Sequence, residues 1–470
     1  MKVAQLLAGM ELAGMAVHLP TLKQPLAAVE ARQAALTRLA ERSLGRAINL
    51  ASPQQVSEAL YVTLRLPKPQ GGEAAAKAGH GSTADAALQA LVRSHPQCPL
   101  PAWVLEYREV SKLRAAFLEP YIERVVDGPR GARLFCTWQQ MATGTGRLSA
   151  RAPNLQQVPR GVTAVLGADG EAPLSICVRS AFVASPGYVL LAADYKQLEM
   201  RLFAAFSNDP QLQREVRSGG DLFLRLAAMW YKKPCEQVSA EERSGVKAMA
   251  YGLLYGLGID RLAGQISTAS GSAVSQGQAR EMKQRFLKSF PTLGHYMEQI
   301  KRTARRQGKA LTVGGRMRLL PLITSASRDE QAKAERQAIN STIQGSAADV
   351  MKDAMLRCRD ELHQRRLPAV LLAQARDETL LTMLQPLPCY SLPCHVPTYQ
   401  VHDELIFEVP APLLAAAARC VKHCMETIQI SHAARFELPP LPVSLVAGAS
   451  WGAMQPLLDD GADVEEARGS

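Results

Sequence analysis

Two apolar, strand-like segments of this chain carry carboxylates where a folded protein usually buries hydrocarbon. Residues 399–409 (YQVHDELIFEV) are interrupted by Asp403 and Glu404, and residues 188–193 (YVLLAA) lead directly into Asp194. Burying such carboxylates is costly unless a cation meets them. Taken together, the two segments predict a divalent-metal site assembled from distant parts of the sequence. Either segment alone would equally suit a salt-bridged or solvated turn.

A second pattern predicts a helix with one cationic and aromatic face. Ser239 followed by Glu242 is a capping-box pattern, so the helix should begin there. Four residues at spacing four then share one face: Arg243, Lys247, Tyr251 and Tyr255. The stretch from Arg243 to Tyr251 spans roughly 12 Å, about the length of a triphosphate plus sugar, and the helix N-terminus favours phosphate. The same spacing also suits an amphipathic helix with solvated cations and tyrosines at a core edge.

Two further segments carry polar groups suited to a sugar-phosphate backbone. Residues 143–159 (TGTGRLSARAPNLQQVP) form a loop rich in Gly and Pro, and residues 335–349 (ERQAINSTIQGSAAD) predict a helix with polar side chains at spacing four. The candidate contacts are Arg147, Asn154, Gln156 and Gln157 in the loop and Arg336, Asn340 and Gln344 on the helix. Each segment alone would also suit a solvated loop or a solvated helix face.

Composition narrows the class of protein and of partner. A chain of 470 residues is long enough for more than one structural unit. Lys and Arg number 54 against 43 Asp and Glu, and the resulting net charge of +11 favours a polyanionic partner such as nucleic acid. No apolar run approaches the length of a membrane span, so a membrane role is not expected.

The nine cysteines are scattered, and we interpret them as reduced thiols. The closest approaches to a metal-binding pattern are Cys389 with Cys394 and His395, and Cys420 with His423 and Cys424. The second group fits one face of an otherwise apolar helix. Core or surface thiols are therefore favoured over structural zinc.

In this order, the segments resemble the sequence motifs of family A DNA polymerases. LLAADYKQLEMRL (190–202) and VHDELIFEV (401–409) are similar to the family's two palm motifs, and RSGVKAMAYGLLYG (243–256) is similar to its fingers-helix motif. The loop and helix described above also match, as does TVGGRMRLLP between them. The resemblance covers essentially the whole chain.

Within that family, the chain is most similar to the theta-type branch, with the nu-type branch next. Phe223 stands where bacterial polymerase I enzymes usually carry His, and Tyr251 stands where many of them carry Phe. An insertion just before the His-Asp-Glu strand is also theta-like. The insertion after the QQVP loop, residues 161–177, is short by comparison.

The resemblance implies an α+β fold shaped like a right hand, with an antiparallel palm sheet and helical fingers and thumb. The expected divisions are a thumb-like helical region (1–120, with an insertion at about 67–84), a first part of the palm (121–204), the fingers (205–330) and a second part of the palm (331–470, with an insertion at about 365–398). About 120 residues precede the palm, which is too few for an exonuclease domain beside a thumb, so none is expected.

The resemblance also implies a role for each candidate residue. The catalytic group would be Asp194, Asp403, Glu404 and Lys247, and the metal ligands Asp194, Asp403 and the Tyr195 carbonyl. Nucleotide binding would use Gln197, Glu199, Phe223, Arg243, Lys247, Tyr251 and Tyr255, and DNA binding would use Arg147, Asn154, Gln156, Arg336, Asn340, Gln344 and His402. Glu199 would exclude a ribose 2′-hydroxyl, unless it simply pairs with Arg201. The implied cofactor is a pair of Mg²⁺ ions, replaceable by Mn²⁺.

The function implied is a DNA-templated DNA polymerase that uses primer-template DNA and dNTPs, with a theta-like role in end joining and translesion synthesis and a nuclear location. A general repair or replicative polymerase of the polymerase I type is an alternative, and a catalytically inactive DNA-binding scaffold is another. The sequence predicts no particular protein partner.

Overall fold

An antiparallel sheet holds together segments from both halves of the chain. The computed structural model describes residues 2–68, 81–159, 162–164, 174–375, 404–428 and 438–457. The sheet has five strands in the order β11 (Val370–Ala375), β12 (Glu404–Pro410), β8 (Tyr188–Tyr195), β13 (Val443–Gly448) and β14 (Gln455–Pro456). All its pairings are antiparallel, so the predicted α+β architecture with a central antiparallel sheet is confirmed.

The two central strands are the two carboxylate-bearing segments recognised in the sequence. Residues of β8 and β12 are buried along most of their length, because helices cover the sheet. Helix α16 (Leu414–Glu426) packs on β8, β12 and β13, and α15 (Arg328–Gln364) packs behind α16. Strand β11 shows that the insertion expected from about residue 365 begins later, since Val370–Ala375 already pairs with β12.

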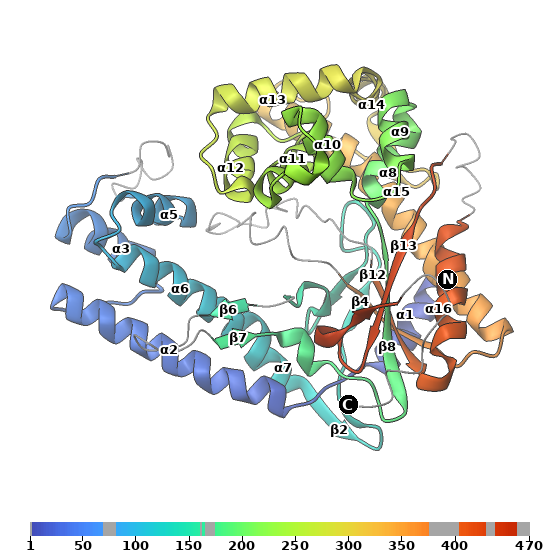
Figure 1. Cartoon of the computed structure of the whole chain (residues 1–470), viewed down its shortest axis with the longest axis horizontal. Coiled ribbons are helices and arrows are strands. Elements are labelled where there is room, and N and C mark those ends of the chain that lie inside the picture. Colours follow the sequence, from blue (N-terminus) through green and yellow to red (C-terminus); the bar gives the residue numbers. More distant parts are fainter. Residues whose placement is uncertain are drawn as a thin grey trace.

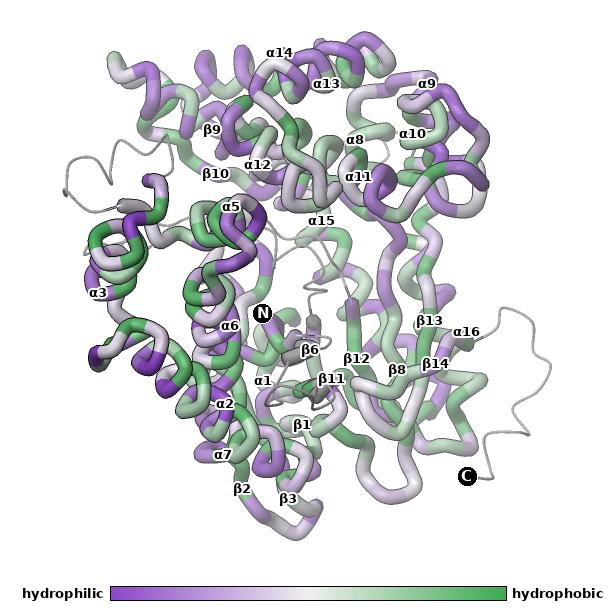
Figure 2. Tube along the Cα trace, turned by 60° about the vertical axis from the view of Figure 1, so that its left-hand side comes forward, coloured by the Kyte–Doolittle hydropathy of each residue, from purple (hydrophilic) through white to green (hydrophobic). Residues whose placement is uncertain are grey.

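Seven helices follow β8 and form the upper group in Figure 1. They are α8 (Leu198–Ser207), α9 (Pro210–Arg217), α10 (Leu222–Tyr231), α11 (Ala240–Leu254), α12 (Ile259–Ser270), α13 (Gln276–Ser289) and α14 (Pro291–Gln307). Ser239 and Glu242 form the predicted capping box at the start of α11. Figure 2 shows hydrophilic residues along α13 and α14 and hydrophobic residues along the central strands.

The N-terminal region is a helical arm with its own core. Its helices are α2 (Pro20–Leu44), α3 (Pro53–Glu58), α5 (Asp85–Ser94), α6 (Leu100–Leu113) and α7 (Glu119–Arg124), with single π-type turns at Ala59–Thr63 and Arg114–Leu118. Ser52 caps α3 and Pro53 occupies its first position. Pro96 and Pro99 lie between α5 and α6, where the helical pattern is interrupted. Residues 69–80 of the first insertion lie outside the described residues.

The remaining elements are short. They are α1 (Lys2–Ala13), β1 (Met15–Ala16), β2 (Val125–Gly128), β3 (Gly131–Leu134), β4 (Thr137–Gln139), β5 (Ser149–Arg151), β6 (Val162–Ala164), β7 (Leu174–Ile176), β9 (Lys309–Leu311) and β10 (Met317–Leu319), with 3₁₀ turns at Leu155–Gln157, Val178–Ala181, Cys235–Gln237, Ala411–Leu413 and Trp451–Ala453. Among the helices that the structure describes, none combines the length and the apolar character needed to span a bilayer.

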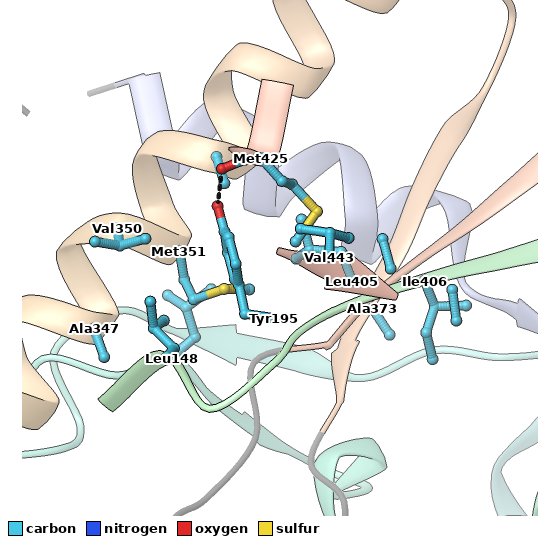
Figure 3. Close-up of a cluster of buried hydrophobic side chains, with 14 of the residues drawn as sticks. Leu148, Tyr195, Ala347, Val350, Met351, Ala373, Leu405, Ile406, Met425 and Val443 are labelled. Carbon is cyan, nitrogen blue, oxygen red and sulfur yellow. Dashed lines mark hydrogen bonds between the residues drawn. The ribbon is translucent and has the colours of Figure 1, made fainter. Parts of the chain in front are cut away.

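Tyr195 anchors the end of β8 to the helices behind the sheet. Its ring lies among apolar side chains such as Met351 and Val443, and its hydroxyl donates to the Met425 carbonyl of α16 at 2.6 Å (Figure 3). Both partners are buried, so the hydrogen bond forms where water cannot replace it. The position of Asp194, one residue earlier, therefore depends on the packing of α16.

Replacing Tyr195 with Phe should lower the free energy of unfolding by about 1–2 kcal/mol, because the variant leaves the Met425 carbonyl without this donor. Urea denaturation of both proteins measures the difference. Tyr188→Phe on the same strand is the matched control, since the Tyr188 side chain is 40% exposed and should change stability little. Equal losses for the two variants would contradict the anchoring role.

Candidate active site

Two carboxylates lie opposite each other where β8 ends and β12 begins, on neighbouring strands of the sheet. Asp194 lies directly opposite Glu404 in the antiparallel register, with Ser444 of β13 on its other side. Directly opposed residues project from the same face of a sheet. Ser444 donates a hydrogen bond from its hydroxyl to the Asp194 carbonyl at 3.3 Å. The predicted convergence of the two carboxylate-bearing strands is thus present.

Glu404 is met by a buried cation that the sequence analysis did not identify. The Arg179 Nη1 lies 3.9 Å from the Glu404 carboxylate, and both side chains are almost fully buried. Arg179 also donates from Nε to the Val158 carbonyl at 3.0 Å, and its guanidinium lies 4.3 Å from the Trp451 ring centroid. The only sequence signal for it was one Arg within an otherwise apolar segment, residues 176–184. This cation compensates for the burial of Glu404 and fits a structural carboxylate.

The donor set around Asp194 suits a hard divalent cation. Asp194 supplies carboxylate oxygens, which are the ligands that Mg²⁺ prefers, and the start of β12 lies directly opposite it. Asp403 and His402 immediately precede β12 and lie outside the described residues. Among the residues that are described, no group of three His, Cys, Asp or Glu side chains is arranged to hold a metal. The assignment of Asp194, Tyr195 and Asp403 as metal ligands therefore stays a prediction.

The predicted face of α11 is continuous in the structure. Tyr251 and Tyr255 are buried and stack with their ring centroids 5.9 Å apart, and Phe223 lies 5.5 Å from Tyr251. The Lys247 ammonium lies 5.9 Å from the Phe223 ring centroid, which is within cation–π range. Arg243 and Lys247 are half-buried. This argues against the alternative of an amphipathic helix whose cations are fully solvated.

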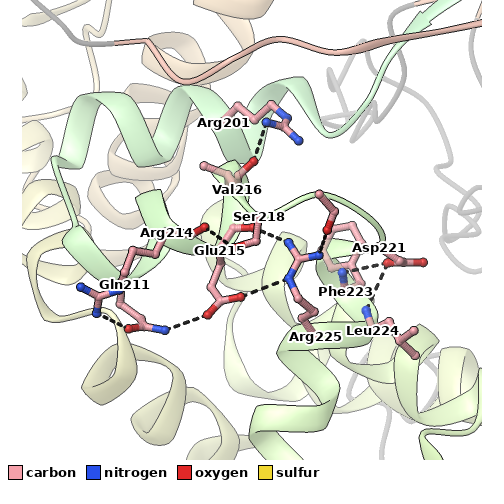
Figure 4. Close-up of polar contacts among 11 residues, drawn as sticks. Arg201, Gln211, Arg214, Glu215, Val216, Ser218, Asp221, Phe223, Leu224 and Arg225 are labelled. Atoms are coloured by element: carbon pink, nitrogen blue, oxygen red, sulfur yellow. Dashed lines mark hydrogen bonds and ion pairs between the residues drawn. The ribbon is translucent and has the colours of Figure 1, made fainter. Parts of the chain in front are cut away.

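Arg243, at the cationic end of this face, is held by Asp221. Its Nε donates to the Asp221 carboxylate at 2.6 Å, while the other oxygen of Asp221 caps α10 by accepting from the backbone of Phe223 and Leu224 (Figure 4). Burial alone would raise the pKa of Asp221, but the hydrogen bonds from Arg243 and the α10 backbone outweigh it and lower the pKa. Asp221 is therefore ionised at neutral pH and orients Arg243.

Nearby polar contacts brace the two helices that precede α11. Arg225 of α10 forms an ion pair with Glu215 of α9 at 3.3 Å and donates to the Glu215 and Gly219 carbonyls (Figure 4). Arg225 thus fixes the loop that leads into Asp221. This bracing was not predicted, because it depends on how α9 and α10 pack.

Glu199 of α8 connects two other segments that are far from it in sequence. Its carboxylate pairs with Arg147 from the loop and accepts from the Tyr255 hydroxyl at the end of α11, and all three side chains are buried. The alternative pairing of Glu199 with Arg201 is wrong. Arg201 instead donates to three carbonyls, those of Lys196, Val216 and Pro440.

Burial and then the neighbouring Arg225 lower the pKa of Arg201 to about 10. Two positions apart on α8, Glu199 and Arg201 point in different directions, which explains why they do not pair.

The other predicted DNA contacts that the structure describes lie in the loop of residues 143–159 and on α15. Gln156 accepts from the Ala150 backbone at 2.8 Å, and Asn154 caps the short turn that follows it. Asn340 and Gln344 are buried on α15, where the predicted helix is confirmed. Two further predicted residues are half-buried. Gln197 has a left-handed backbone conformation just before α8, and Arg336 lies beside Gly256.

Arg316 ties the loop to α15, a role that sequence reasoning missed. Its Nη2 donates to the Thr145 carbonyl at 2.6 Å and to the Gly345 carbonyl at 3.0 Å, and its Nε donates to Asp349 at 3.1 Å. Gly146 has a positive φ of 79°, and a Cβ there would collide with the Arg316 guanidinium. The TVGGRMRLLP segment was recognised only as part of the resemblance.

Comparison with known proteins identifies the family. The model of DNA polymerase family A matches residues 20–386. The chain belongs to this family. The antiparallel sheet that carries Asp194 agrees with the palm sheet expected for this family. The division of the chain at residues 120, 204 and 330 is tested by none of these matches and stays a prediction.

Relatives and solved structures agree with this placement. The chain is 33% identical over 449 residues to the thermostable DNA polymerase I of Thermus filiformis, covering 96% of this chain and 47% of the relative. It is 35% identical over 356 residues to DNA polymerase I of Pseudomonas aeruginosa, covering 76% of this chain and 36% of the relative. The chain thus spans about half the length, or less, of these curated relatives.

A solved structure confirms the polymerase-domain fold. The chain is similar, with a TM-score of 0.78 and 31% identity, to the POL domain of Pol1 from M. smegmatis in complex with DNA primer-template and dNTP. The match covers 96% of this chain and 70% of that one. Family A polymerases use divalent metal ions, which agrees with the carboxylates gathered at Asp194.

Breaking the buried Arg147–Glu199 pair should be strongly destabilising. Replacing Arg147 with Met should cost about 3–5 kcal/mol of unfolding free energy, because the Glu199 carboxylate would stay buried without this cation. Adding Glu199→Gln should restore part of the loss, and a double-mutant cycle in urea gives the coupling. Losses that simply add would show that the two side chains do not interact energetically.

Proposed function

We propose that this chain is a DNA-templated DNA polymerase that adds deoxynucleotides to a primer 3′ end. The observation that carries the proposal is the placement of Asp194 beside the start of β12, at the centre of a family A palm. The likeness to a polymerase domain bound to primer-template DNA and dNTP supports the same substrates here.

The carboxylates at the centre of the palm would hold the metal ions. Asp194 and Asp403, with the Tyr195 carbonyl, would bind two Mg²⁺ ions, for which Mn²⁺ can substitute. When bound, such a pair stabilises the attacking 3′ oxygen and the leaving pyrophosphate oxygen in line. Glu404, which pairs with Arg179, would have a structural role beside these ligands.

The face of α11 would bind the incoming nucleotide. Arg243 and Lys247 would hold the triphosphate, and Lys247 would donate a proton to the departing pyrophosphate. Tyr251 and Phe223 form an apolar wall suited to the sugar, and Tyr255 would lie by the templating base pair. Glu199, buried between Arg147 and Tyr255, would leave no room for a 2′-hydroxyl, with Gln197 nearby on the corner before α8.

The DNA would lie along the loop and α15. The groups that would contact it are Arg147, Asn154, Gln156, Arg336, Asn340, Gln344 and His402. Contacts on the minor-groove side distinguish base pairs poorly, so this binding would tolerate any sequence. Arg147 would then exchange its pairing with Glu199 for a contact to DNA.

The similarity to DNA polymerase I proteins favours a general repair or replicative role of that type. The theta-like residues Phe223 and Tyr251 are the observation that favours the second candidate, a polymerase for end joining and translesion synthesis. A nuclear location belongs to that second candidate alone.

Primer extension distinguishes these roles. With Mg²⁺ and dNTPs, the chain should extend an ordinary primer-template. A parallel substrate of single strands that share only a few complementary 3′-terminal bases tests the end-joining role. Extension of both substrates supports the theta-type role, extension of the first alone supports the polymerase I type, and DNA binding without extension of either would indicate a scaffold.

Replacing Asp194 with Asn should abolish synthesis while leaving primer-template affinity within a few-fold of the original, because the change removes a metal-binding charge and little volume. Single-turnover extension and fluorescence anisotropy measure the two quantities. Asp403→Asn should behave in the same way. An equal loss of DNA binding would contradict the assignment as metal ligands.

Replacing Lys247 with Ala should reduce single-nucleotide incorporation by about 100-fold or more, since a positioned donor to the triphosphate is lost. Rapid-quench kinetics over a range of dNTP concentrations measure this. Lys301→Ala is the matched control, because Lys301 lies on α14 and pairs with Glu298. Unchanged kinetics for Lys247→Ala would refute its role at the triphosphate.

A further inference from the structure

Three cysteine thiols gather between α15 and α16, outside the candidate active site. Cys358 belongs to α15, whereas Cys420 and Cys424 belong to α16, and all three residues are at most 2% exposed. Cys420 and Cys424 are close in sequence, whereas Cys358 is more than 60 positions away and joins them only through the packing of α15 on α16. The proposed polymerase function uses none of the three.

The thiols of Cys358 and Cys424 each reach across to the opposite helix. Cys358 Sγ donates to the Val421 carbonyl at 3.9 Å, and Cys424 Sγ donates to the Arg357 carbonyl at 3.8 Å. Because Arg357 is adjacent to Cys358 and Val421 lies one turn before Cys424, these reciprocal contacts bring the two sulfur atoms together between the helices.

The surroundings of Cys424 favour its thiolate. Hydrogen bonding from the Cys358 thiol lowers the pKa of Cys424 to about 7, against the opposing effect of burial, and the Cys420 thiol and Arg357 contribute in the same direction. Glu361 opposes them. In contrast, burial raises the pKa of Cys136 to about 12, and the Glu11 carboxylate acts in the same direction.

We propose that Cys424 and Cys358 are a peroxide-sensitive thiol pair that closes a disulfide between α15 and α16. The Cys424 thiolate attacks one oxygen of hydrogen peroxide and breaks the O–O bond, which gives a sulfenic acid and, after protonation, water. The Cys358 thiol then attacks the Cys424 sulfur and forms the S–S bond while a second water leaves. Two thiols and one peroxide therefore yield one disulfide and two waters.

Geometry selects Cys358 rather than Cys420 as the resolving thiol. Residues four apart on a helix have Cβ atoms about 5–6 Å apart. A disulfide requires a Cβ separation of roughly 3.5–4.5 Å, so Cys420 and Cys424 cannot bridge without distorting α16. No arrangement in the described part of the chain brings three such side chains around a metal, so the cluster does not fit a zinc site.

The bridge would act close to the palm. Met425, which follows Cys424, accepts the hydrogen bond from Tyr195, and Arg357, which precedes Cys358, donates to the Thr427 carbonyl. A covalent link at this point would fix α15 against the helix that anchors β8. We therefore expect oxidation to raise the midpoint of thermal unfolding.

The test starts from the reduced, purified full chain treated with hydrogen peroxide. Trypsin digestion without reductant cuts after Arg419 and Lys422 and so places Cys420 and Cys424 on separate peptides. Mass spectrometry should then recover the peptides of Cys358 and Cys424 joined and lighter by two hydrogen atoms. Dithiothreitol should separate them and reverse the rise in the unfolding midpoint. Recovery of both cysteines as free thiols, or of Cys424 joined to any other cysteine, would overturn the proposal.

Variants distinguish the thiol that attacks peroxide, Cys424, from the resolving thiol, Cys358. Cys358→Ser should leave Cys424 trapped as a sulfenic acid that reacts with dimedone, and Cys424→Ser should abolish both products. Cys420→Ser should still form the bridge, and Cys136 in the unaltered protein is the matched buried thiol that should stay unmodified. If Cys136 reacts as fast as Cys424, the cluster confers no special reactivity and the proposal fails. Circular dichroism confirms that each variant is folded before it is compared.

Discussion

The register between β8 and β12 is the constraint on which the rest of the site depends. Because side chains alternate along a strand, a slip of one residue would turn Asp194 away from the face that it shares with Glu404. The buried apolar residues on both strands prevent such a slip, since it would also move their side chains out of their packing against α16. The hydrophobic core thus fixes the position of the carboxylates, and Arg179 makes the burial of Glu404 tolerable.

Buried polar side chains connect the loop of residues 143–159 with α11 and α15. Glu199 joins the loop at Arg147 to the end of α11 at Tyr255, and Arg316 joins the same loop to α15. Each of these groups is satisfied by partners from a different segment. A movement of α11 must therefore exchange these contacts for others, which suits a site where a nucleotide and a base pair arrive and leave.

Patterns in the sequence predicted the elements well and their partners poorly. The strand of residues 188–193, the described part (404–409) of the strand-like segment predicted over 399–409, the capping box of α11 and the polar helix around Asn340 follow from local periodicity and are confirmed. The alternative pairing of Glu199 with Arg201 is wrong, and the true partners were not predicted because they lie 52 and 56 positions away in sequence. Arg179 and Arg316 were missed for the same reason. Each is a single Arg whose role exists only after distant segments have packed.

Helix α15 connects the helices that follow β8 with the helix that packs on the palm sheet. Its 37 residues form one rod of about 55 Å, which contacts α14 and α8 near the fingers and α16 beneath the palm. If this rod moves as a rigid body, both of its ends move together. A change in how its C-terminal half packs on α16 would then also displace the N-terminal half that carries Asn340 and Gln344, which would couple the packing behind the palm to the proposed DNA contacts.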